Sequence, residues 1–114
     1  MDNCIFCKII KGEIPCKKVY EDELILAFED INPEAPVHVL IIPKKHIDSL
    51  DSLKEENKDI LSHIFIKARD LARELGIAED GYRVVNNCGV NGGQTVLHMH
   101  FHILGGRNLQ WPPG

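Results

Sequence analysis

The chain has 114 residues, of which 44% are hydrophobic and 26% are charged. This composition is ordinary for a globular protein and argues against disorder, and the length predicts one compact domain spanning residues 1–114. The net charge of −4 excludes a sequence-independent grip on nucleic acid or on an anionic membrane, because both need a basic face.

The N-terminus lacks the pattern of a signal peptide, because Asp2 stands where such a segment has bases and Lys8 interrupts its short apolar run. The longest apolar stretch, around Val39 to Ile42, is too short to cross a membrane. We therefore expect a soluble, cytoplasmic protein. In a reducing compartment, its four cysteines are better interpreted as metal ligands or buried thiols than as disulfides.

The first half of the chain predicts one short helix and then three strands, at residues 4–11, 19–21, 24–29 and 37–42. In the helix, Ile5 and Ile9 recur at helical spacing, and Gly12 can end it. The first two strands flank a turn at Asp22. The third strand is β-branched and apolar and stops at Pro43, which predicts burial on both faces.

The second half predicts a long helix and two strands, at residues 53–75, 82–86 and 96–104. A capping box of Ser52 and Glu55 predicts where the helix starts, an apolar stripe runs along it, and Gly76 predicts its end. The last two strands should form a hairpin around the glycine-rich turn at 89–93. Strands grouped about one long helix, without alternating βαβ units, predict an α+β domain with an antiparallel sheet.

Three histidines, His98, His100 and His102, alternate with apolar residues. Period two predicts a strand with the apolar residues in the core and the histidines on the other face. The outer imidazoles would stand about 13 Å apart, too far for one metal ion but suited to a groove. The preceding glycine-rich segment 89–95 can turn backbone N–H groups towards an anion.

Imidazole is largely neutral and nucleophilic at pH 7 and can also carry a proton. The histidine row beside the glycine-rich segment therefore predicts a site for phosphate chemistry. The alternative interpretation is that the three histidines form a polar strand face by coincidence and have no function. A metal site that uses two of the three histidines with other ligands can coexist with catalysis.

The segment His98-Met-His-Phe-His-Ile-Leu104 matches the signature His-x-His-x-His followed by apolar residues. On this motif the sequence resembles the histidine triad (HIT) family. Further matching segments cover nearly the whole chain: Phe28–His38, Ile42–His46, Gly92–Thr95 and Gly105–Gly114. The Trp-Pro-Pro-Gly ending resembles the Hint branch, the histidine triad nucleotide-binding proteins. The resemblance implies a five-stranded antiparallel sheet with one long and one short helix, and a homodimer with a continuous ten-stranded sheet.

The resemblance also implies a purine nucleoside phosphoramidase, which cleaves the P–N bond of adenosine 5′-phosphoramidates and releases AMP and an amine. His100 would be the nucleophile and would form an adenylyl-histidine intermediate. His102 would contact the phosphate and assist proton transfer, while His98 and His38 would orient the site.

By the same resemblance, a nucleotide would be held by Phe6, Ile9, Phe28 and Ile31 around the base, Asp30 at the ribose, Asn87 near the ribose and phosphate, Gly93, Gln94 and Thr95 at the phosphate and leaving group, and Trp111 from the neighbouring subunit. The apolar residues of this set could equally be plain core, and Asp30 could be only a turn residue.

A C-x-x-C pair near the N-terminus resembles that of bacterial histidine triad proteins that bind zinc through two cysteines and two histidines. This implies a closed tetrahedral site made of Cys4, Cys7, His46 and His98. The site would make zinc a structural cofactor, with none required for the chemistry, and His98 only indirectly catalytic. The alternative is two buried thiols on one helix face.

Two other functions remain open: a nucleotide-sensing or partner-docking module with little turnover, and a dinucleoside polyphosphate hydrolase. The intact triad favours an enzyme, and the Hint-like ending disfavours the second alternative. Cys16 and Cys88 show no partner, and we expect His63, on the long helix, to be solvated.

Overall fold

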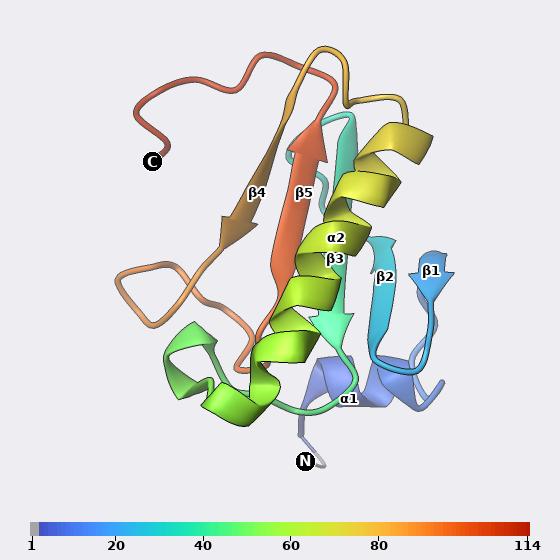
Figure 1. Cartoon of the computed structure of the whole chain (residues 1–114), viewed down its shortest axis with the longest axis vertical. Coiled ribbons are helices and arrows are strands. Elements are labelled where there is room, and N and C mark those ends of the chain that lie inside the picture. Colours follow the sequence, from blue (N-terminus) through green and yellow to red (C-terminus); the bar gives the residue numbers. More distant parts are fainter. Residues whose placement is uncertain (1–2) are drawn as a thin grey trace.

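The structure, a computed structural model of the chain, describes residues 3–114. Its elements are α1 (Ile5–Ile10), β1 (Lys18–Glu21), β2 (Ile25–Glu29), β3 (Val37–Pro43), α2 (Lys58–Glu74), β4 (Tyr82–Asn86) and β5 (Phe101–Gly105), with short 3₁₀ turns at Leu50–Ser52 and Glu55–Asn57. Figure 1 shows the strands side by side with α2 lying across one face of them. Within the described residues, no helix is long and apolar enough to cross a membrane.

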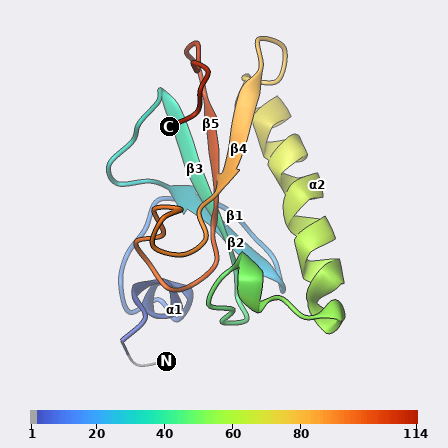
Figure 2. The same cartoon turned by 90° about the vertical axis from the view of Figure 1, so that its left-hand side faces the viewer.

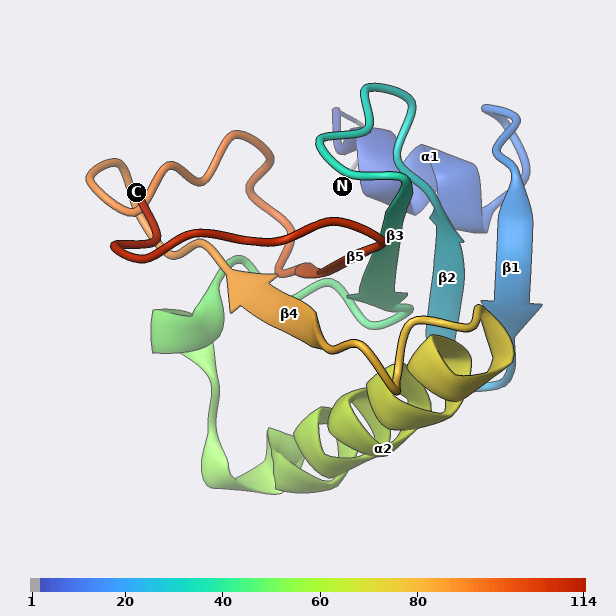
Figure 3. The ribbon, with the colours of Figure 1, turned by 90° about the horizontal axis from the view of Figure 1, so that it is seen from above.

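The strands form one five-stranded sheet in the order β1-β2-β3-β5-β4, and every neighbouring pair is antiparallel. The predicted α+β class, the antiparallel sheet and the final hairpin are therefore confirmed. Figures 2 and 3 show α2 on one side of the sheet and α1 on the other. The strand β3 is buried along nearly its whole length, as its sequence predicts, because it lies between these two layers.

Side chains of β3 alternate between two apolar clusters. Val39 and Ile41 belong to the core between the sheet and α2, whereas Leu40 and Ile42 belong to the cluster under α1. The second cluster also contains Phe6 of α1. The short helix α1 is thus held against the sheet by the buried Phe6 ring, with Ile9 and Ile10 packing partly buried against the same cluster.

The start predicted for the long helix is wrong, because α2 begins at Lys58. Leu53 and Lys54 have extended backbone, with ψ of 144° and 161°, so the box between Ser52 and Glu55 cannot form. A box forms instead further along the chain and caps the 3₁₀ turn Glu55–Asn57 that leads into α2: the Asn57 side-chain oxygen accepts the Lys54 N–H at 3.1 Å. The other end is confirmed: Gly76 follows the helix at φ +77°, a conformation that favours glycine.

The last strand is also shorter than predicted, because β5 begins at Phe101 and not at residue 96. Met99 is fully buried as expected, but its N–H donates to Ile47 O at 2.6 Å, outside the sheet. The chain before Phe101 therefore follows the loop after β3. As a consequence, His98 and His100 precede the strand, and the three histidines do not stand in one row.

His63 is not simply solvated, contrary to the expectation from its place on the long helix. Its Nε2 lies 2.6 Å from Asp22 Oδ2, which also accepts the Tyr20 hydroxyl at 2.8 Å. Burial raises the pKa of Asp22, but the hydrogen bonds from His63, Leu24 N and Tyr20 outweigh burial and hold that pKa well below its usual range. The pair joins α2 to the turn between β1 and β2.

Candidate functional site

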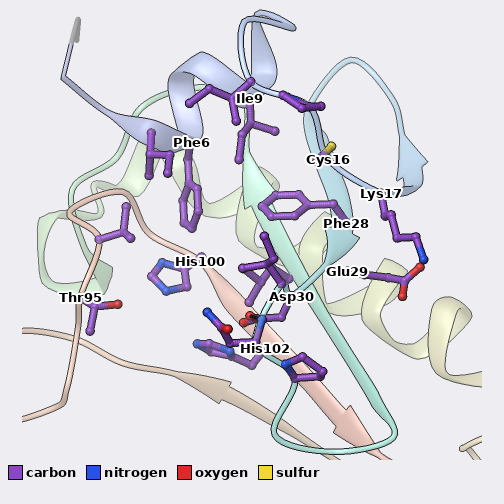
Figure 4. Close-up of a pocket in the computed structure, with 18 residues that line it drawn as sticks. Phe6, Ile9, Cys16, Lys17, Phe28, Glu29, Asp30, Thr95, His100 and His102 are labelled. Carbon is purple, nitrogen blue, oxygen red and sulfur yellow. Dashed lines mark hydrogen bonds between the residues drawn. The ribbon is translucent and has the colours of Figure 1, made fainter.

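A pocket of about 870 Å³ lies on the face of the sheet that carries α1 (Figure 4). Eight residues that the sequence assigns to the nucleotide or to catalysis line it: Phe6, Ile9, Phe28, Asp30, Ile31, Thr95, His100 and His102. One end is apolar, where the Phe6 and Phe28 rings meet edge to face with centroids 5.8 Å apart. The other end carries the histidines and the Asp30 carboxylate.

The pocket also has walls that the sequence did not indicate: Ile5, Ile14, Pro15, Cys16, Lys17, Glu29, Asn32, Pro33, Leu40 and Val96. Residues 14–17 form the connection between α1 and β1, which the sequence indicates only as a turn. No periodicity marks such a segment, and only packing of α1 on the sheet brings it to the pocket. Cys16, which had no assigned partner, faces this space.

His100 is 4% exposed, and its Nδ1 lies 2.8 Å from the carbonyl oxygen of His98. A carbonyl oxygen can only accept, so Nδ1 carries the proton and donates it. In the neutral ring, the lone pair is then on Nε2, the nitrogen free to act as a nucleophile. The Phe6 ring packs edge-on against this imidazole, with centroids 5.1 Å apart, and restricts its orientation.

A chain of hydrogen bonds sets the proton positions of the two histidines behind the pocket. The Glu34 N–H donates to His38 Nδ1 at 3.0 Å, so the neutral His38 ring carries its proton on Nε2. That Nε2–H points at His102 Nδ1, 2.8 Å away, with Asp30 Oδ2 at 3.3 Å. His102 therefore accepts at Nδ1 and carries its own proton on Nε2.

The same proton positions argue against a metal ion held by Asp30, His38 and His102, although one ligand atom from each lies within 4.8 Å of the others. A metal ligand must offer a lone pair, and His38 Nε2 carries a hydrogen instead. The cluster is better understood as a hydrogen-bonded support for His102. His38 does not line the pocket and acts from behind it.

His102 is neutral at physiological pH. Burial lowers its pKa to about 4, and the neighbouring His100 and His38 rings add to this effect, while Asp30 opposes it. The neutral ring can donate one hydrogen bond from Nε2 to a ligand in the pocket. That donor is suited to a phosphoryl oxygen or a leaving group.

His98 is fully buried, and its ring does not line the pocket. It lies in a cluster with Cys4, Cys7 and His46. Their four ligand atoms lie within 4.8 Å of one another. His98 Nδ1 is 3.3 Å from Cys4 Sγ and 3.7 Å from Cys7 Sγ, and His46 Nδ1 is 3.3 Å from Cys7 Sγ. Tetrahedral zinc with bonds of about 2.3 Å to sulfur and about 2.0 Å to nitrogen needs separations close to these.

The surroundings of the four residues also fit a zinc site. His98 Nε2 lies 2.8 Å from Pro43 O, and His46 Nε2 lies 2.8 Å from Asp48 Oδ1. These acceptors place the ring protons on Nε2 and turn both Nδ1 lone pairs towards the thiols, as second partners of metal-binding histidines do. The predicted ligand set is thus brought together by α1, the loop after β3 and the segment before β5.

The remaining predicted residues lie outside the pocket. Gln94 donates to Asp48 O at 2.7 Å and accepts the Gly89 N–H at 3.0 Å, while Asn87 donates to Gly92 O at 2.7 Å. These side chains hold the glycine-rich turn in shape. Their contact with a phosphate stays a prediction, as do those of Gly93, in the same turn, and of Trp111, which is 80% exposed on the C-terminal segment.

Known proteins share both the sequence and this architecture. The HIT domain family matches residues 11–109. A 14 kDa zinc-binding protein of Zea mays is 53% identical over 112 residues, which cover 96% of this chain and 87% of the maize protein. The crystal structure of a HIT family hydrolase from Legionella pneumophila is 53% identical, with a TM-score of 0.97 over 98% of this chain and 100% of that one.

A histidine triad nucleotide-binding protein from Candida albicans is 40% identical, with a TM-score of 0.83 over 96% of this chain and 83% of that one. A five-stranded antiparallel sheet with one long helix is the fold that these structures share with this chain. The chain belongs to the HIT domain family.

The low pKa of His102 predicts a pH dependence of stability. The unfolded chain binds a proton at His102 near pH 6.5, but the folded one only near pH 4, so the free energy of unfolding should fall as pH drops through this window. The groups that face the ring are His100, His38 and Asp30. Urea unfolding should show a shallower fall for His102→Gln than for the natural chain, and parallel curves would contradict the assignment.

Proposed function

We propose that this protein binds a purine nucleotide in the pocket and hydrolyses the P–N bond of adenosine 5′-phosphoramidates, as an enzyme of the Hint branch. The observation that carries the proposal is the hydrogen bond from His100 Nδ1 to His98 O, which leaves a buried Nε2 lone pair at the pocket. The similarity to the Legionella hydrolase and to the Candida nucleotide-binding protein supports it.

The pocket suits the three parts of AMP. The Phe6 and Phe28 rings offer an apolar slot for the base. Asp30 keeps one carboxylate oxygen engaged with the Asn32 N–H at 2.8 Å, which fixes the side chain so that the carboxylate can accept from a ribose diol. The phosphate would then lie against His100 and His102, and Thr95 offers a hydroxyl beside them.

In the first step, His100 Nε2 attacks the α-phosphorus, a phosphorus–Nε2 bond forms and the phosphorus–amine bond breaks. The amine leaves with one proton taken up from the solvent. The His98 carbonyl, which accepts the Nδ1–H, stabilises the positive charge that develops on the ring. In the second step, water replaces the histidine on phosphorus, AMP leaves and the proton of the water is released. His102 Nε2–H donates to a phosphoryl oxygen in both steps.

We also propose that Cys4, Cys7, His46 and His98 hold one structural zinc ion. When bound, the ion supplies no chemistry to the pocket but ties α1 to the sheet. The helix α1 that carries Cys7 also carries the pocket residue Phe6, and Cys4 caps its N-terminus. The zinc-binding relative in maize supports the proposal.

We further propose that the protein is a homodimer joined along β4. In the sheet order, β4 is an edge strand, and the free N–H and C=O groups of an edge can pair with another chain. Phe65 of α2 is 48% exposed and packs on Phe101 of β5, so apolar surface lies near this edge. In such a dimer, Trp111 of one subunit would reach the pocket of the other.

The nucleophile is tested by His100→Ala. We expect this variant to lose turnover of a fluorogenic adenosine phosphoramidate while AMP still binds, because Phe6, Phe28 and Asp30 remain. Mass spectrometry of the acid-quenched natural protein should show an AMP adduct on His100. Unchanged hydrolysis in the variant would overturn the role of His100, and AMP binding without turnover by the natural protein would favour a sensing module.

The zinc content of the natural protein and of two cysteine variants tests the zinc proposal. Protein purified without a histidine tag should contain about one zinc ion per chain. Cys7→Ser should lower both the zinc content and the affinity for AMP measured by calorimetry, since α1 then loses its tie to the sheet. Cys88→Ser, a cysteine outside the cluster, is the matched control and should change neither. A zinc content near zero in the natural protein would refute the proposal.

Light scattering tests the dimer. At micromolar concentration we expect twice the mass of one chain, because an unpaired β4 edge favours association. A mass of one chain over the whole accessible range of concentration would contradict the proposal. It would also leave Trp111 without a neighbouring pocket.

A further inference from the structure

The segment that follows β5 grips the loop between β2 and β3 at two points. Arg107 directs its Nε and Nη2 to a single acceptor, Glu34 O, at 3.1 and 2.9 Å. Gly106, at φ +92°, lies so close to the loop that a Cβ there would be 2.9 Å from Pro36 Cβ. None of these four residues lines the pocket.

Glu34, whose carbonyl accepts from Arg107, also sets the proton positions of the histidines behind the pocket. Glu34 offers its carbonyl to Arg107 and its N–H to His38 Nδ1. His38 in turn faces His102 Nδ1 through Nε2 at 2.8 Å. A continuous series of contacts thus connects Arg107, on the surface, to His102, in the pocket.

We propose that Arg107 is a positioning residue for the phosphoryl chemistry, acting through Glu34 and His38 to keep the His102 proton on Nε2. The inference rests on the proposed function. Without the grip, the Glu34 N–H can leave His38 Nδ1, and that nitrogen is then free to take the proton. His38 Nε2 would become an acceptor, which draws the His102 proton to Nδ1 and removes the donor that faces the phosphate.

The residue type matters because one planar guanidinium meets the carbonyl with two donors at once. Its Nη1 adds a third bond, to Asn108 O at 3.2 Å, which orients the group. Lysine carries a single ammonium group on a flexible stem and cannot reproduce this fork. We therefore expect Arg107→Lys to retain only part of the effect.

The expected defect is in turnover and not in nucleotide affinity. Asp30, the ribose ligand of the proposal, is held without Arg107: its N–H donates to His38 O at 3.0 Å, as a continuation of the β2–β3 pairing. The two rings of the base slot, Phe6 and Phe28, lie on α1 and β2 and not in the loop that Arg107 holds. Ile31, the predicted base residue in that loop, is 90% exposed. Loss of the grip should therefore leave KM unchanged and lower kcat.

The test compares Arg107→Met, Arg107→Lys and Arg83→Met. Arg83 is a matched control because its Nη2 donates to carbonyl oxygens of the same C-terminal segment, those of Leu109 and Gln110, but not to the loop. We would measure hydrogen exchange at the Glu34 amide and the ring ¹⁵N shifts of His38 and His102 in the resting protein. Turnover of an adenosine phosphoramidate gives kcat and KM.

For Arg107→Met we expect faster exchange at Glu34, ring shifts of His102 displaced towards the other tautomer, and kcat lowered about tenfold with KM within about twofold. Arg107→Lys should fall between this variant and the natural protein, and Arg83→Met should leave exchange and ring shifts unchanged. Unchanged exchange and ring shifts in Arg107→Met would overturn the proposal.

Equal effects of Arg83→Met on exchange and ring shifts would also overturn it, since they would show a general anchoring of the C-terminal segment. A raised KM with unchanged kcat would do the same. The natural protein's failure to hydrolyse phosphoramidates would refute the proposed function. Hydrogen exchange and ring shifts need no substrate, so they test the role of Arg107 in that case as well.

Discussion

The antiparallel pairing of β3 with β5 is the constraint on which the pocket depends. Its register sets His38 opposite Leu104 and Leu40 opposite His102, so the two histidines become diagonal neighbours on one face of the sheet. A slip of one residue would turn one of them to the α2 side. The buried alternation of apolar residues on β3 and β5 excludes that slip, because it would place imidazoles in the core.

The position at which β5 begins gives the three histidines of the triad different roles. Because the strand starts at Phe101, the chain before it is free to turn the His98 ring away from the pocket. His98 then serves the cysteine cluster through its side chain and His100 through its main-chain carbonyl. Phe6 of α1 packs edge-on against the rings of His98 and His100, with centroids 5.8 and 5.1 Å apart, so one aromatic residue contacts both the cysteine–histidine cluster and the pocket.

The electrostatics of the pocket explain how an acidic chain can accommodate a phosphate. The imidazole donor is the neutral His102 Nε2–H, whose direction is set by the Glu34 N–H through His38. His100 instead presents its Nε2 lone pair, because its Nδ1–H donates to His98 O. Burial keeps His102 uncharged. A preorganised donor in a partly dry site interacts strongly with an anion without any net positive charge, so the net charge of −4 is no obstacle.

The sequence by itself determined the element types, the α+β class and the histidine triad, because local periodicity and short motifs carry that information. The set of two cysteines and two histidines followed from the resemblance to zinc-binding histidine triad proteins. The tertiary structure decided where α2 and β5 begin, since Lys54 pairs with Asn57 and Met99 with Ile47. It also decided that His63 meets Asp22, that residues 14–17 wall the pocket, and that Arg107 grips Glu34. Each of these contacts, apart from the pairing of Lys54 with Asn57, joins segments far apart in the chain, and only the packed sheet brings such segments together.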